Sequence, residues 1–398
     1  MLSSKKILIA ITGSIAAYKM ISLVRLLTKA GAEVKVIMSP AATQFVSPLV
    51  LSTLTRNPVM HQLADNEEWS NHVMLGRWAD LLLIAPLTCN SLAKMAQGIC
   101  DNMVMAVYLS ATCPVMVAPA MDEDMWLHPS TKRNLAQIKA DGCTVLNVDN
   151  GSLASGLEGE GRMLEPEVIL QHIVMAVGRT NEFAGKRVLI TAGPTQEAID
   201  PVRYISNHSS GKMGFALAET IYLQGGHVTL VAGPVNLPLP FPEIQLVKVT
   251  TAAEMFDAVK QQYQQADILI MCAAVADYTP ETKASFKLKK TTDDFTLHLT
   301  KTTDILGFLG ANKSSQQVLV GFALETHDEL AFAKQKLIAK NADMIVLNSL
   351  NDKEAAFGFD TNKITIISQQ NGVTAFDLQT KKLVAVNIAA SILKEKQA

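Results

Sequence analysis

Short apolar runs alternate with helical patterns along the whole chain. The first run, residues 6–12 (KILIAIT), ends at Gly13-Ser14, and apolar residues then recur every three or four positions from Met20 to Ala30. An unbroken apolar run of this length is typical of a strand that is buried on both faces, and the wider spacing is typical of an amphipathic helix. The pattern therefore predicts a strand, a helix that Gly31 ends, and a second strand over residues 34–38.

The same order of elements returns in the second half of the chain. Residues 187–191 (RVLIT) form an apolar run, a helical pattern covers residues 212–224, and a strand pattern covers residues 228–231. The apolar runs 79–85 (ADLLLIA) and 266–272 (ADILIMC) also resemble one another. Strands that alternate with helices of this length indicate parallel sheets with helices on both faces. The expected fold class is α/β, with two Rossmann-like three-layer domains.

The boundary between the two halves is expected in residues 178–185 (GRTNEFAG), a polar segment with a glycine at each end. We place the first domain at residues 1–181 and the second at residues 182–398. A chain of 398 residues, 48% of them hydrophobic, is long enough for each domain to bury its own core.

Composition and charge narrow the functional class. Lys and Arg number 35 against 37 Asp and Glu, so the chain lacks the basic excess that is typical of nucleic-acid or membrane-surface binding. Its apolar stretches are shorter than the ~18 residues of a membrane span, and no signal-peptide pattern precedes the first strand. Five cysteines without a CxxC pair predict neither a zinc site nor a disulfide framework. We expect a protein of the reducing cytoplasm.

Ligands of parallel sheets bind beyond the carboxyl ends of the strands, so the loops at those ends are the candidate sites. None of these loops contains GxGxxG or GxxxxGK[ST], so the sequence supports neither a dinucleotide fingerprint nor a Walker loop. Gly13-Ser14 still suits a phosphate, because free backbone N–H groups point outward at the start of a helix.

The loops of the first half become specific when they are taken together. Five motifs occur in one order: ITGSIAAYK (11–19), NHVMLGRWAD (71–80), PLTCNS (86–91), PAMDEDMW (119–126) and GEGRM (159–163). In this combination they resemble the flavin-dependent cysteine decarboxylases, and among these the phosphopantothenoylcysteine decarboxylases. The resemblance implies a flavodoxin-like flavoprotein domain with bound FMN. FMN supplies the redox chemistry that makes the loss of a carboxylate beta to a thiol possible.

The same resemblance implies roles for particular residues. His72 would be the catalytic base or the group that orients the substrate. The FMN contacts would be Gly13, Ser14, Ile15, Ser39, Thr88 and Asn90.

Two further catalytic candidates depart from the pattern of that family. Asp122 stands where Asn is common, and an ionised carboxylate only accepts hydrogen bonds, whereas an amide also donates them. Asp122 would have to be protonated, or turned away while backbone groups donate. Ser155 stands where a proton-donating Cys is usual, and a hydroxyl is a far weaker acid than a thiol. The last protonation then needs a relayed water or another donor, for which Glu158 and Glu160 are candidates.

The second half carries a long motif, ITAGPTQEAIDPVRYISNHSSGKMG (190–214), followed by AAVADY (273–278), KLKK (287–290), TDIL (303–306) and GFALET (321–326). These motifs resemble the phosphopantothenate–cysteine ligases, a domain commonly fused behind the decarboxylase in bacteria. The resemblance implies that CTP activates the carboxylate of 4′-phosphopantothenate as an acyl cytidylate, from which the amine of cysteine displaces CMP. Because the activation joins two anions, the site needs positive charge and a metal, for which we expect Mg²⁺.

The ligase resemblance also assigns residues. Asn207 would contact the acyl cytidylate and Lys287 the triphosphate, so both are catalytic candidates. The metal ligands stay open. The CTP contacts would be Ala273, Asp277, Lys287, Thr303, Asp304, Ile305, Leu306, Phe322, Lys336 and Lys340.

Local physics supports part of this assignment. Lys336 and Lys340 stand four apart on an expected helix, a like-charge pair that costs stability unless an anion faces it. The alternative is an ordinary solvated lysine face. Residues 286–289 (FKLK) alternate apolar and basic positions, which is the period of a half-buried strand. Ser209 or Ser210 is suited to cap the helix that follows, which offers a purely structural interpretation of that motif.

One interpretation unites both halves: a bifunctional enzyme of coenzyme A biosynthesis. The second half would make 4′-phospho-N-pantothenoylcysteine, and the first would decarboxylate it to 4′-phosphopantetheine. Decarboxylases of this family form trimers and the ligases form dimers, so the resemblance implies a homo-oligomer as large as a dodecamer. Two alternatives stay open: an active ligase fused to a flavoprotein of altered decarboxylase chemistry, and a non-catalytic scaffold similar to phosphatase-inhibiting relatives.

Overall fold

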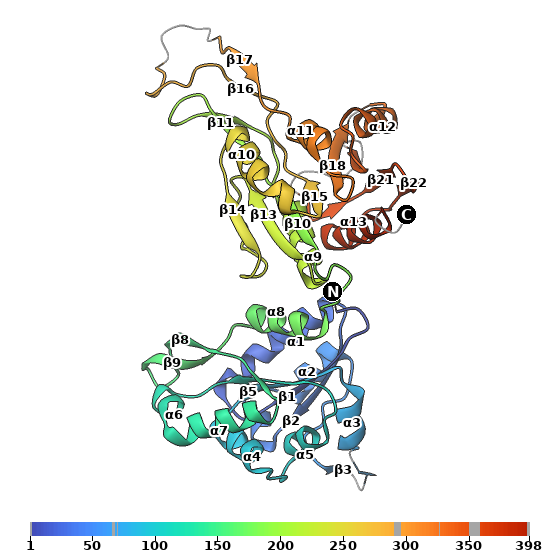
Figure 1. The fold of residues 1–398 in the computed structure, drawn as a ribbon. Helices are drawn as coiled ribbons and strands as arrows, with labels where there is room; N and C mark the ends of the chain where they lie inside the picture. Colours follow the sequence, from blue (N-terminus) through green and yellow to red (C-terminus); the bar gives the residue numbers. More distant parts are fainter. Residues whose placement is uncertain are drawn as a thin grey trace. The chain divides into compact units, whose positions relative to one another are not determined.

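The computed structural model describes residues 2–65, 68–69, 71–289, 296–325, 327–349 and 359–395. The chain divides into two compact units, Met1–Arg179 (unit 1) and Thr180–Ala398 (unit 2), and each builds its own sheet with helices packed against it (Figure 1). The predicted α/β class is confirmed for both units.

Unit 1 contains a five-stranded parallel sheet in the order β2-β1-β5-β6-β7. Numbered among themselves along the chain, these strands have the order 2-1-3-4-5 of flavodoxin-like folds. All seven residues of β5 are buried, which explains why its sequence is continuously apolar. The strands are β1 (Lys6–Ile11), β2 (Glu33–Met38), β5 (Leu81–Leu87), β6 (Val115–Pro119) and β7 (Thr144–Val145).

Helices cover both faces of this sheet. α1 packs against α2 and α8. α3, α4, α5 and α7 pack together over a cluster of buried hydrophobic side chains on the opposite face. The helices are η1 (Ile15–Tyr18), α1 (Lys19–Lys29), η2 (Pro40–Gln44), α2 (Pro48–Thr55), α3 (His72–Trp78), α4 (Cys89–Gln97), α5 (Met103–Ser110), α6 (Glu123–Leu127), α7 (Pro129–Ala140) and α8 (Pro166–Val177).

An antiparallel hairpin follows the sheet of unit 1 and lies beside α6. It consists of β8 (Val148–Ser152) and β9 (Glu158–Met163), joined by residues 153–157, of which 154–157 are exposed. A second short pair, β3 (Ala64–Asp65) and β4 (Glu68–Trp69), precedes α3.

Unit 2 is built on an eight-stranded sheet in the order β14-β13-β10-β15-β18-β19-β21-β22. The first six strands in this order pair in parallel. β21 then pairs antiparallel with β19 and with β22. The strands are β10 (Arg187–Ala192), β13 (His227–Ala232), β14 (Gln245–Lys248), β15 (Ile268–Met271), β18 (Val318–Glu325), β19 (Met344–Ser349), β21 (Ile364–Ser368) and β22 (Gly372–Ala375).

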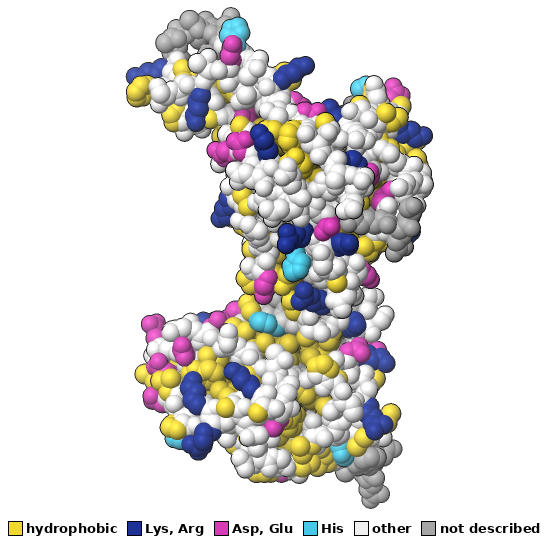
Figure 2. All heavy atoms as spheres, in the orientation of Figure 1, with side chains coloured by type: hydrophobic (Ala, Val, Ile, Leu, Met, Phe, Trp, Pro, Cys, Tyr) yellow, Lys and Arg dark blue, Asp and Glu magenta, His cyan; other side chains and the backbone are white. Residues whose placement is uncertain are grey.

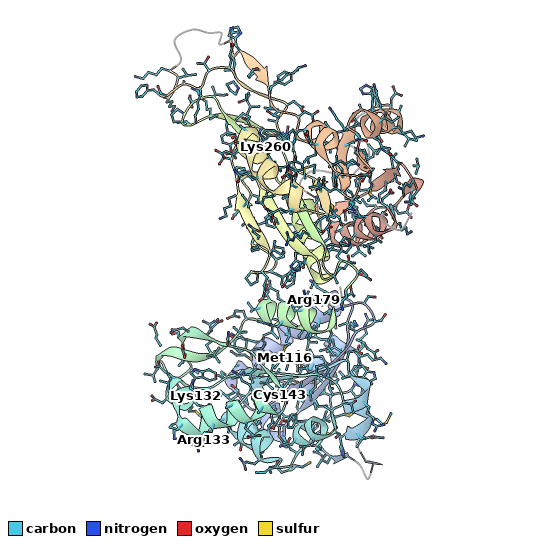
Figure 3. All side chains as sticks on the ribbon, in the orientation of Figure 1. Met116, Lys132, Arg133, Cys143, Arg179 and Lys260 are labelled. Atoms are coloured by element: carbon cyan, nitrogen blue, oxygen red, sulfur yellow. The ribbon has the colours of Figure 1, made fainter. Side chains whose placement is uncertain are left out.

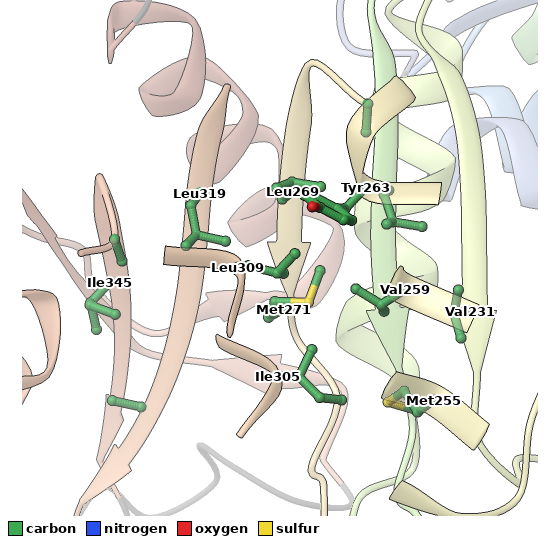
Figure 4. Close-up of a cluster of buried hydrophobic side chains, with 14 of the residues drawn as sticks. Val231, Met255, Val259, Tyr263, Leu269, Met271, Ile305, Leu309, Leu319 and Ile345 are labelled. Carbon is green, nitrogen blue, oxygen red and sulfur yellow. The ribbon is translucent and has the colours of Figure 1, made fainter. Parts of the chain in front are cut away.

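Two groups of helices enclose this sheet. α10 (Ala252–Gln262), α11 (Ile305–Asn312) and α12 (Glu329–Ala339) cover one face, where the side chains of Leu269 and Leu309 are fully buried (Figure 4). α9 (Lys212–Leu223) and α13 (Lys381–Glu395) pack against each other. The connection through α9 runs from β10 to β13, toward one edge of the sheet, and the connection through α11 runs from β15 to β18, toward the other edge. Connections between parallel strands are right-handed, so these two helices lie on opposite faces of the sheet.

Three short antiparallel strand pairs follow the carboxyl ends of parallel strands in unit 2. They are β11 (Gln196–Ala198) with β12 (Tyr204–Ser206), β16 (Tyr278–Pro280) with β17 (Leu299–Lys301), and β20 (Thr361–Asn362) with β23 (Gln379–Thr380); a short helix, η3 (Tyr263–Gln265), follows α10. Within the described ranges, none of the helices combines the length and the apolar character that a membrane crossing requires.

Candidate functional site

The first candidate site lies where the sheet of unit 1 reverses its direction of winding. β1 and β5 are neighbours, but the chain leaves β1 toward β2 and leaves β5 toward β6. Such a reversal opens a crevice beyond the carboxyl ends of the two strands. Hydrogen bonds tie the two loops there: the hydroxyl of Thr12 donates to the carbonyl oxygen of Pro86 at 2.6 Å and accepts from the N–H of Thr88 at 3.2 Å.

Gly13, Ser14 and Ser39 form a polar cradle at this crevice. A Cβ on Gly13 would stand 2.7 Å from the Cβ of Ala41, so only glycine allows the two loops to approach this closely. The hydroxyl of Ser39 is buried and has no hydrogen-bond partner among the described residues. A buried polar group of this kind is costly unless a ligand satisfies it. Together with the N–H groups at the start of η1, the cradle fits the phosphate of FMN.

The other flavin contacts expected from the sequence surround the same crevice. The hydroxyl of Thr88 caps α4 by accepting from the N–H of Ser91 at 3.4 Å, and Asn90 is an exposed residue in the first turn of that helix. Ile15 is 60% exposed on η1. An exposed apolar side chain next to a polar cradle suits the planar ring of a flavin.

The three catalytic candidates of unit 1 come from three separate elements. His72 is the half-buried first residue of α3, a helix that the side chain of Asn71 caps by accepting from Met74 N–H at 3.1 Å. Asp122 precedes α6. Ser155 lies exposed at the tip of the β8–β9 hairpin.

The carboxylate of Asp122 caps its own helix. It accepts a hydrogen bond from the N–H of Glu123 at 3.0 Å, at the first residue of α6. Of the two roles that the sequence left open, this geometry corresponds to a side chain that is turned toward the backbone.

The β8–β9 hairpin is fastened to the loop that carries Asp122. The N–H of Met121 donates to the carbonyl oxygen of Gly161 at 3.0 Å, and the indole N–H of Trp126 donates to Glu160 at 3.0 Å. The ammonium of Lys132, on α7, lies 4.1 Å from the centre of the Trp126 ring, a cation–π contact (Lys132 is labelled in Figure 3). Glu160, one of the two proposed replacements for the missing thiol donor, is thus held by Trp126.

The second candidate site is a cavity of about 830 Å³ in unit 2. The sheet reverses its winding between β10 and β15, and the cavity lies at the carboxyl ends of these two strands. All but one of the residues that the ligase resemblance assigns line this cavity: Asn207, Ala273, Asp277, Thr303, Asp304, Ile305, Leu306, Phe322, Lys336 and Lys340.

Asn207 is oriented by the loop that follows β15. Its side-chain amide donates to the carbonyl oxygens of Ala274 and Val275, at 3.0 and 3.1 Å. Both N–H donors of the amide are thereby occupied, so the amide oxygen is the group available to a substrate.

The two lysines near α12 have protein partners. Lys340 forms an ion pair of 2.5 Å with Asp304, which also caps α11 by accepting from the N–H of Gly307 at 2.9 Å. The ammonium of Lys336 donates to the carbonyl oxygen of Phe322 at 2.9 Å, and burial lowers the pKa of this lysine. The anion that the like-charge pair was expected to need is therefore present in the protein itself, because the carboxylate of Asp304 lies beside Lys340.

The predicted strand over residues 286–289 is wrong. These residues form a loop, Phe286 is 83% exposed, and Lys287 is exposed and does not line the cavity. The conformation is set by tertiary contacts: the N–H of Leu288 donates to the carboxylate of Asp200 at 3.1 Å, and its carbonyl oxygen accepts from Arg203 at 2.8 Å.

The alternative interpretation of residues 207–214, in which Ser209 or Ser210 caps α9, is wrong. The residue at the cap position is Gly211, whose φ of 78° lies in the left-handed region, and no side chain caps the helix. The hydroxyl of Ser209 instead accepts from the N–H of Gly211 at 3.3 Å.

Several cavity residues received no role from the sequence: Lys212, Lys301, Asn348, Asn362 and Lys381. Lys212 lies inside the SSGKMG stretch, so that motif could have indicated it as a cavity residue. Lys381 belongs to none of the motifs, so no local sequence pattern indicated it. Lys290 and Thr326, at the ends of two ligase motifs, lie outside the described residues. Among the described residues, no three His, Cys, Asp or Glu side chains gather into a metal-binding group.

Comparison with known proteins defines the class of both units. Residues 1–178 match the family model "Flavoprotein", and residues 183–396 match "DNA/pantothenate metabolism flavoprotein C-terminal domain". The chain is therefore a flavoprotein joined to this C-terminal domain. It belongs to the family of coenzyme A biosynthesis bifunctional proteins CoaBC.

Curated relatives cover nearly the whole chain. The CoaBC proteins of Bacillus subtilis (strain 168) and Escherichia coli (strain K12) are 43% and 42% identical, over 98% and 96% of this chain and 97% and 95% of their own length. A "Cysteine/Cysteine sulfinic acid decarboxylase" from an unknown prokaryotic organism is 48% identical over 87% of this chain and 99% of its own length.

One solved structure is similar to about half of the chain. The C-terminal domain of a CoaBC protein is 42% identical, covers 54% of this chain and 97% of its own, and superposes with a TM-score of 0.46.

Proposed function

We propose that this chain catalyses two consecutive steps of coenzyme A biosynthesis. The domain of residues 182–398 would join cysteine to 4′-phosphopantothenate, and the domain of residues 1–181 would decarboxylate 4′-phospho-N-pantothenoylcysteine to 4′-phosphopantetheine. The observation that carries the proposal is the cavity at the β10/β15 reversal, which gathers residues from distant motifs into one lysine-rich site. Membership of the CoaBC family supports it.

In the ligase half, CTP would activate the acid as an acyl cytidylate. Lys336 and Lys340 would face the nucleotide, and Asn207 would hold the intermediate through its amide oxygen. Mg²⁺ would enter with CTP, because this ion usually keeps several waters and binds through substrate phosphates with one or two carboxylates. Asp277 is an exposed carboxylate at the cavity and is suited to such a role. Lys287, outside the cavity wall, would reach the triphosphate only after its loop has moved.

In the decarboxylase half, Gly13, Ser14 and Ser39 would hold the phosphate of FMN, with Ile15, Thr88 and Asn90 around the ring. Bound FMN supplies the reversible oxidation of the substrate thiol. His72 would orient the substrate or take up its proton. Ser155 would act through a relayed water, because its hydroxyl is too weak an acid to replace a thiol directly.

We also propose a homo-oligomer in the cytoplasm, with a dodecamer as the largest assembly. Apolar side chains exposed on unit 1 support association, and free thiols at all five cysteines suit a reducing compartment.

A second candidate keeps the fold and changes the substrate of the flavin half. The relative named as a cysteine and cysteine sulfinic acid decarboxylase is 48% identical over both units. Together with Asp122 and Ser155, this similarity favours free cysteine or its sulfinic acid as the alternative substrate.

One experiment distinguishes the two candidates. The purified chain is given 4′-phosphopantothenate, cysteine, CTP and Mg²⁺, and products are followed by mass spectrometry. We expect 4′-phosphopantetheine. If phosphopantothenoylcysteine accumulates and added cysteine or cysteine sulfinic acid is decarboxylated instead, the second candidate replaces the first for unit 1. If no phosphopantothenoylcysteine forms, the ligase assignment is wrong.

A further inference from the structure

Both units carry a buried threonine at the carboxyl end of the first strand of their sheet. Thr12 directly follows β1, and Thr191 is the last residue but one of β10. The two residues are 1% and 2% exposed. β1 and β10 each border the point where the sheet reverses its winding, so a ligand-binding loop lies across from each threonine. A buried hydroxyl is costly unless it has hydrogen-bond partners.

Thr12 finds its partners across the reversal of unit 1. Continued by two residues, the register of β1 with β5 places Thr12 opposite Pro86. The hydroxyl donates to the carbonyl oxygen of Pro86 at 2.6 Å and accepts from the N–H of Thr88, two residues further along, at 3.2 Å. Thr88 is one of the expected FMN contacts. The buried hydroxyl of Thr12 therefore fixes the backbone of a ligand-binding residue.

Thr191 makes the equivalent contact in unit 2. The register of β10 with β15 pairs it with Met271. Its hydroxyl donates to the sulfur of Met271 at 3.9 Å and accepts from the N–H of Ala273, two residues further along, at 3.2 Å. Ala273 lines the cavity and is an expected CTP contact. The offset from strand partner to bonded N–H and the length of this hydrogen bond are thus the same in both units.

The two contacts differ in strength. The hydroxyl of Thr12 donates to a carbonyl oxygen, whereas that of Thr191 donates to a thioether sulfur, which is a weak acceptor. Backbone groups also hold the loop of unit 2, because the N–H of Ala274 donates to the carbonyl oxygen of Gly193 at 2.9 Å. The loop of unit 2 therefore depends less on its threonine than the loop of unit 1 does.

We propose that Thr12 and Thr191 are equivalent positioning residues, which hold the flavin-binding loop of unit 1 and the nucleotide-binding loop of unit 2 across the reversal of each sheet. The inference rests on the proposed function for the identity of the two ligands. A loop that is already in place binds its ligand more tightly, because less conformational freedom is lost on binding.

Valine variants test this role, because valine has the shape of threonine without its hydroxyl. In the full chain, Thr12→Val raises the Kd for FMN about 10-fold and Thr191→Val raises the KM for CTP about 3-fold, as expected for the loss of one hydrogen bond of greater and of lesser strength. Thr12→Ser and Thr191→Ser keep the hydroxyl and restore the wild-type values. Flavin fluorescence after dilution measures the Kd, and steady-state kinetics of the ligase step give the KM.

Each valine variant is the control for the other unit, so Thr12→Val leaves the KM for CTP unchanged and Thr191→Val leaves the Kd for FMN unchanged. Thr55→Val is the control for a purely structural loss in unit 1. Thr55 is 8% exposed, and its hydroxyl donates to the carbonyl oxygen of Leu51 at 3.0 Å within α2. Thr55→Val lowers the urea midpoint of unfolding and leaves FMN binding unchanged. If Thr12→Val weakens FMN binding no more than Thr55→Val does, the inference is wrong for unit 1.

A measurement without ligands separates the inference from the proposed function. Hydrogen–deuterium exchange of peptides that cover Thr88 and Ala273 follows the two N–H groups that the threonines accept from. Exchange is faster than in wild type in the matching valine variant and returns to the wild-type rate in the serine variant. Unchanged exchange in both valine variants overturns the inference, whether or not the chain binds FMN and CTP. Faster exchange in a chain that binds neither ligand supports the two contacts and contradicts the proposed function.

Discussion

Asp122 shows how one side chain serves both stability and a proposed reaction. Its carboxylate caps α6 at 3.0 Å, and either Asp or Asn satisfies this geometry equally well. The choice between them therefore concerns the substrate more than the fold. In the proposed reaction, a carboxylate at this place would repel the carboxylate that is removed, whereas an amide would donate to it.

Asp122→Asn is expected to lower the KM for phosphopantothenoylcysteine several-fold, with the free energy of unfolding changed by less than ~0.5 kcal/mol. Release of CO2 under steady-state conditions and urea unfolding measure the two quantities. Asp122→Ala is the control for the cap, and its loss of about 1 kcal/mol separates the two effects. A KM that increases in the Asn variant would contradict the proposed contact with the substrate.

At the scale of elements, the sequence predicted best what local pattern encodes. β5 and β15 are recognisable because every residue in them is buried, so no polar position interrupts the apolar run. The loop of residues 286–289 was mistaken for a strand because Asp200 and Arg203, more than 80 residues earlier, fix the backbone of Leu288. Lys381 was missed because its place at the cavity follows from sheet order, which no local pattern records.

The β8–β9 hairpin depends on one close backbone approach. Gly161 has a φ of 132°, and a Cβ there would stand 2.3 Å from the carbonyl oxygen of Met121. Gly161→Ala is expected to destabilise unit 1 by more than ~2 kcal/mol and to weaken FMN retention, because the hairpin must move away from the loop before α6.

Gly156→Ala is the matched control: its φ of 90° carries the same type of strain, but no atom lies within 4 Å of the added Cβ. Its cost is about 1 kcal/mol. Urea unfolding and flavin absorbance after gel filtration measure both, and equal effects would contradict the role of this contact.

A charged cluster joins α1, α8 and β9. The buried ammonium of Lys19 donates to Glu165 at 3.0 Å, Arg162 donates to the same carboxylate at 2.7 Å, and the hydrogen bond from Lys19 lowers the pKa of Glu165. A carboxyl whose pKa is lower in the folded protein contributes stability above its ordinary pKa of about 4.5, and this contribution is lost as the pH falls through the folded value.

Glu165→Gln is therefore expected to destabilise unit 1 by about 1–2 kcal/mol at pH 7 and by progressively less as the medium becomes more acidic than pH 4.5. Solvent screening keeps this loss small, because Glu165 is 43% exposed. Denaturant unfolding across this pH range measures the effect. Asp101→Asn, which removes the more exposed pair with Lys94, is the control and should cost less than ~0.5 kcal/mol. A loss in Glu165→Gln that does not depend on pH would refute the linkage.

At the scale of the whole molecule, unit 1 exposes several large apolar side chains. Hydrophobic side chains gather on the face of unit 1 drawn in Figure 2. The most exposed include Leu49 at 74%, Tyr18 at 58%, Met74 at 57% and Leu127 at 55%. Exposed apolar side chains that gather on one face mark interaction surfaces.

Light scattering is expected to give a mass above the 43.0 kDa of one chain, and Leu49→Lys should reduce this mass. A wild-type monomer at all concentrations would contradict the proposed oligomer.

The two units are compact by themselves, which makes their activities separable by mutation. His72→Gln leaves unit 2 untouched, so this chain should accumulate phosphopantothenoylcysteine. Asn207→Asp replaces an amide that donates to two carbonyl oxygens by a carboxylate that repels them, so this chain should make none, yet should decarboxylate phosphopantothenoylcysteine that is supplied. Mixing the two variants should restore 4′-phosphopantetheine after a lag, because the intermediate must leave one chain and enter another. Mass spectrometry over time follows both products, with wild type as the control. If the mixture makes the intermediate but no phosphopantetheine, the reaction requires both activities in one chain, and the two units are not independent catalysts.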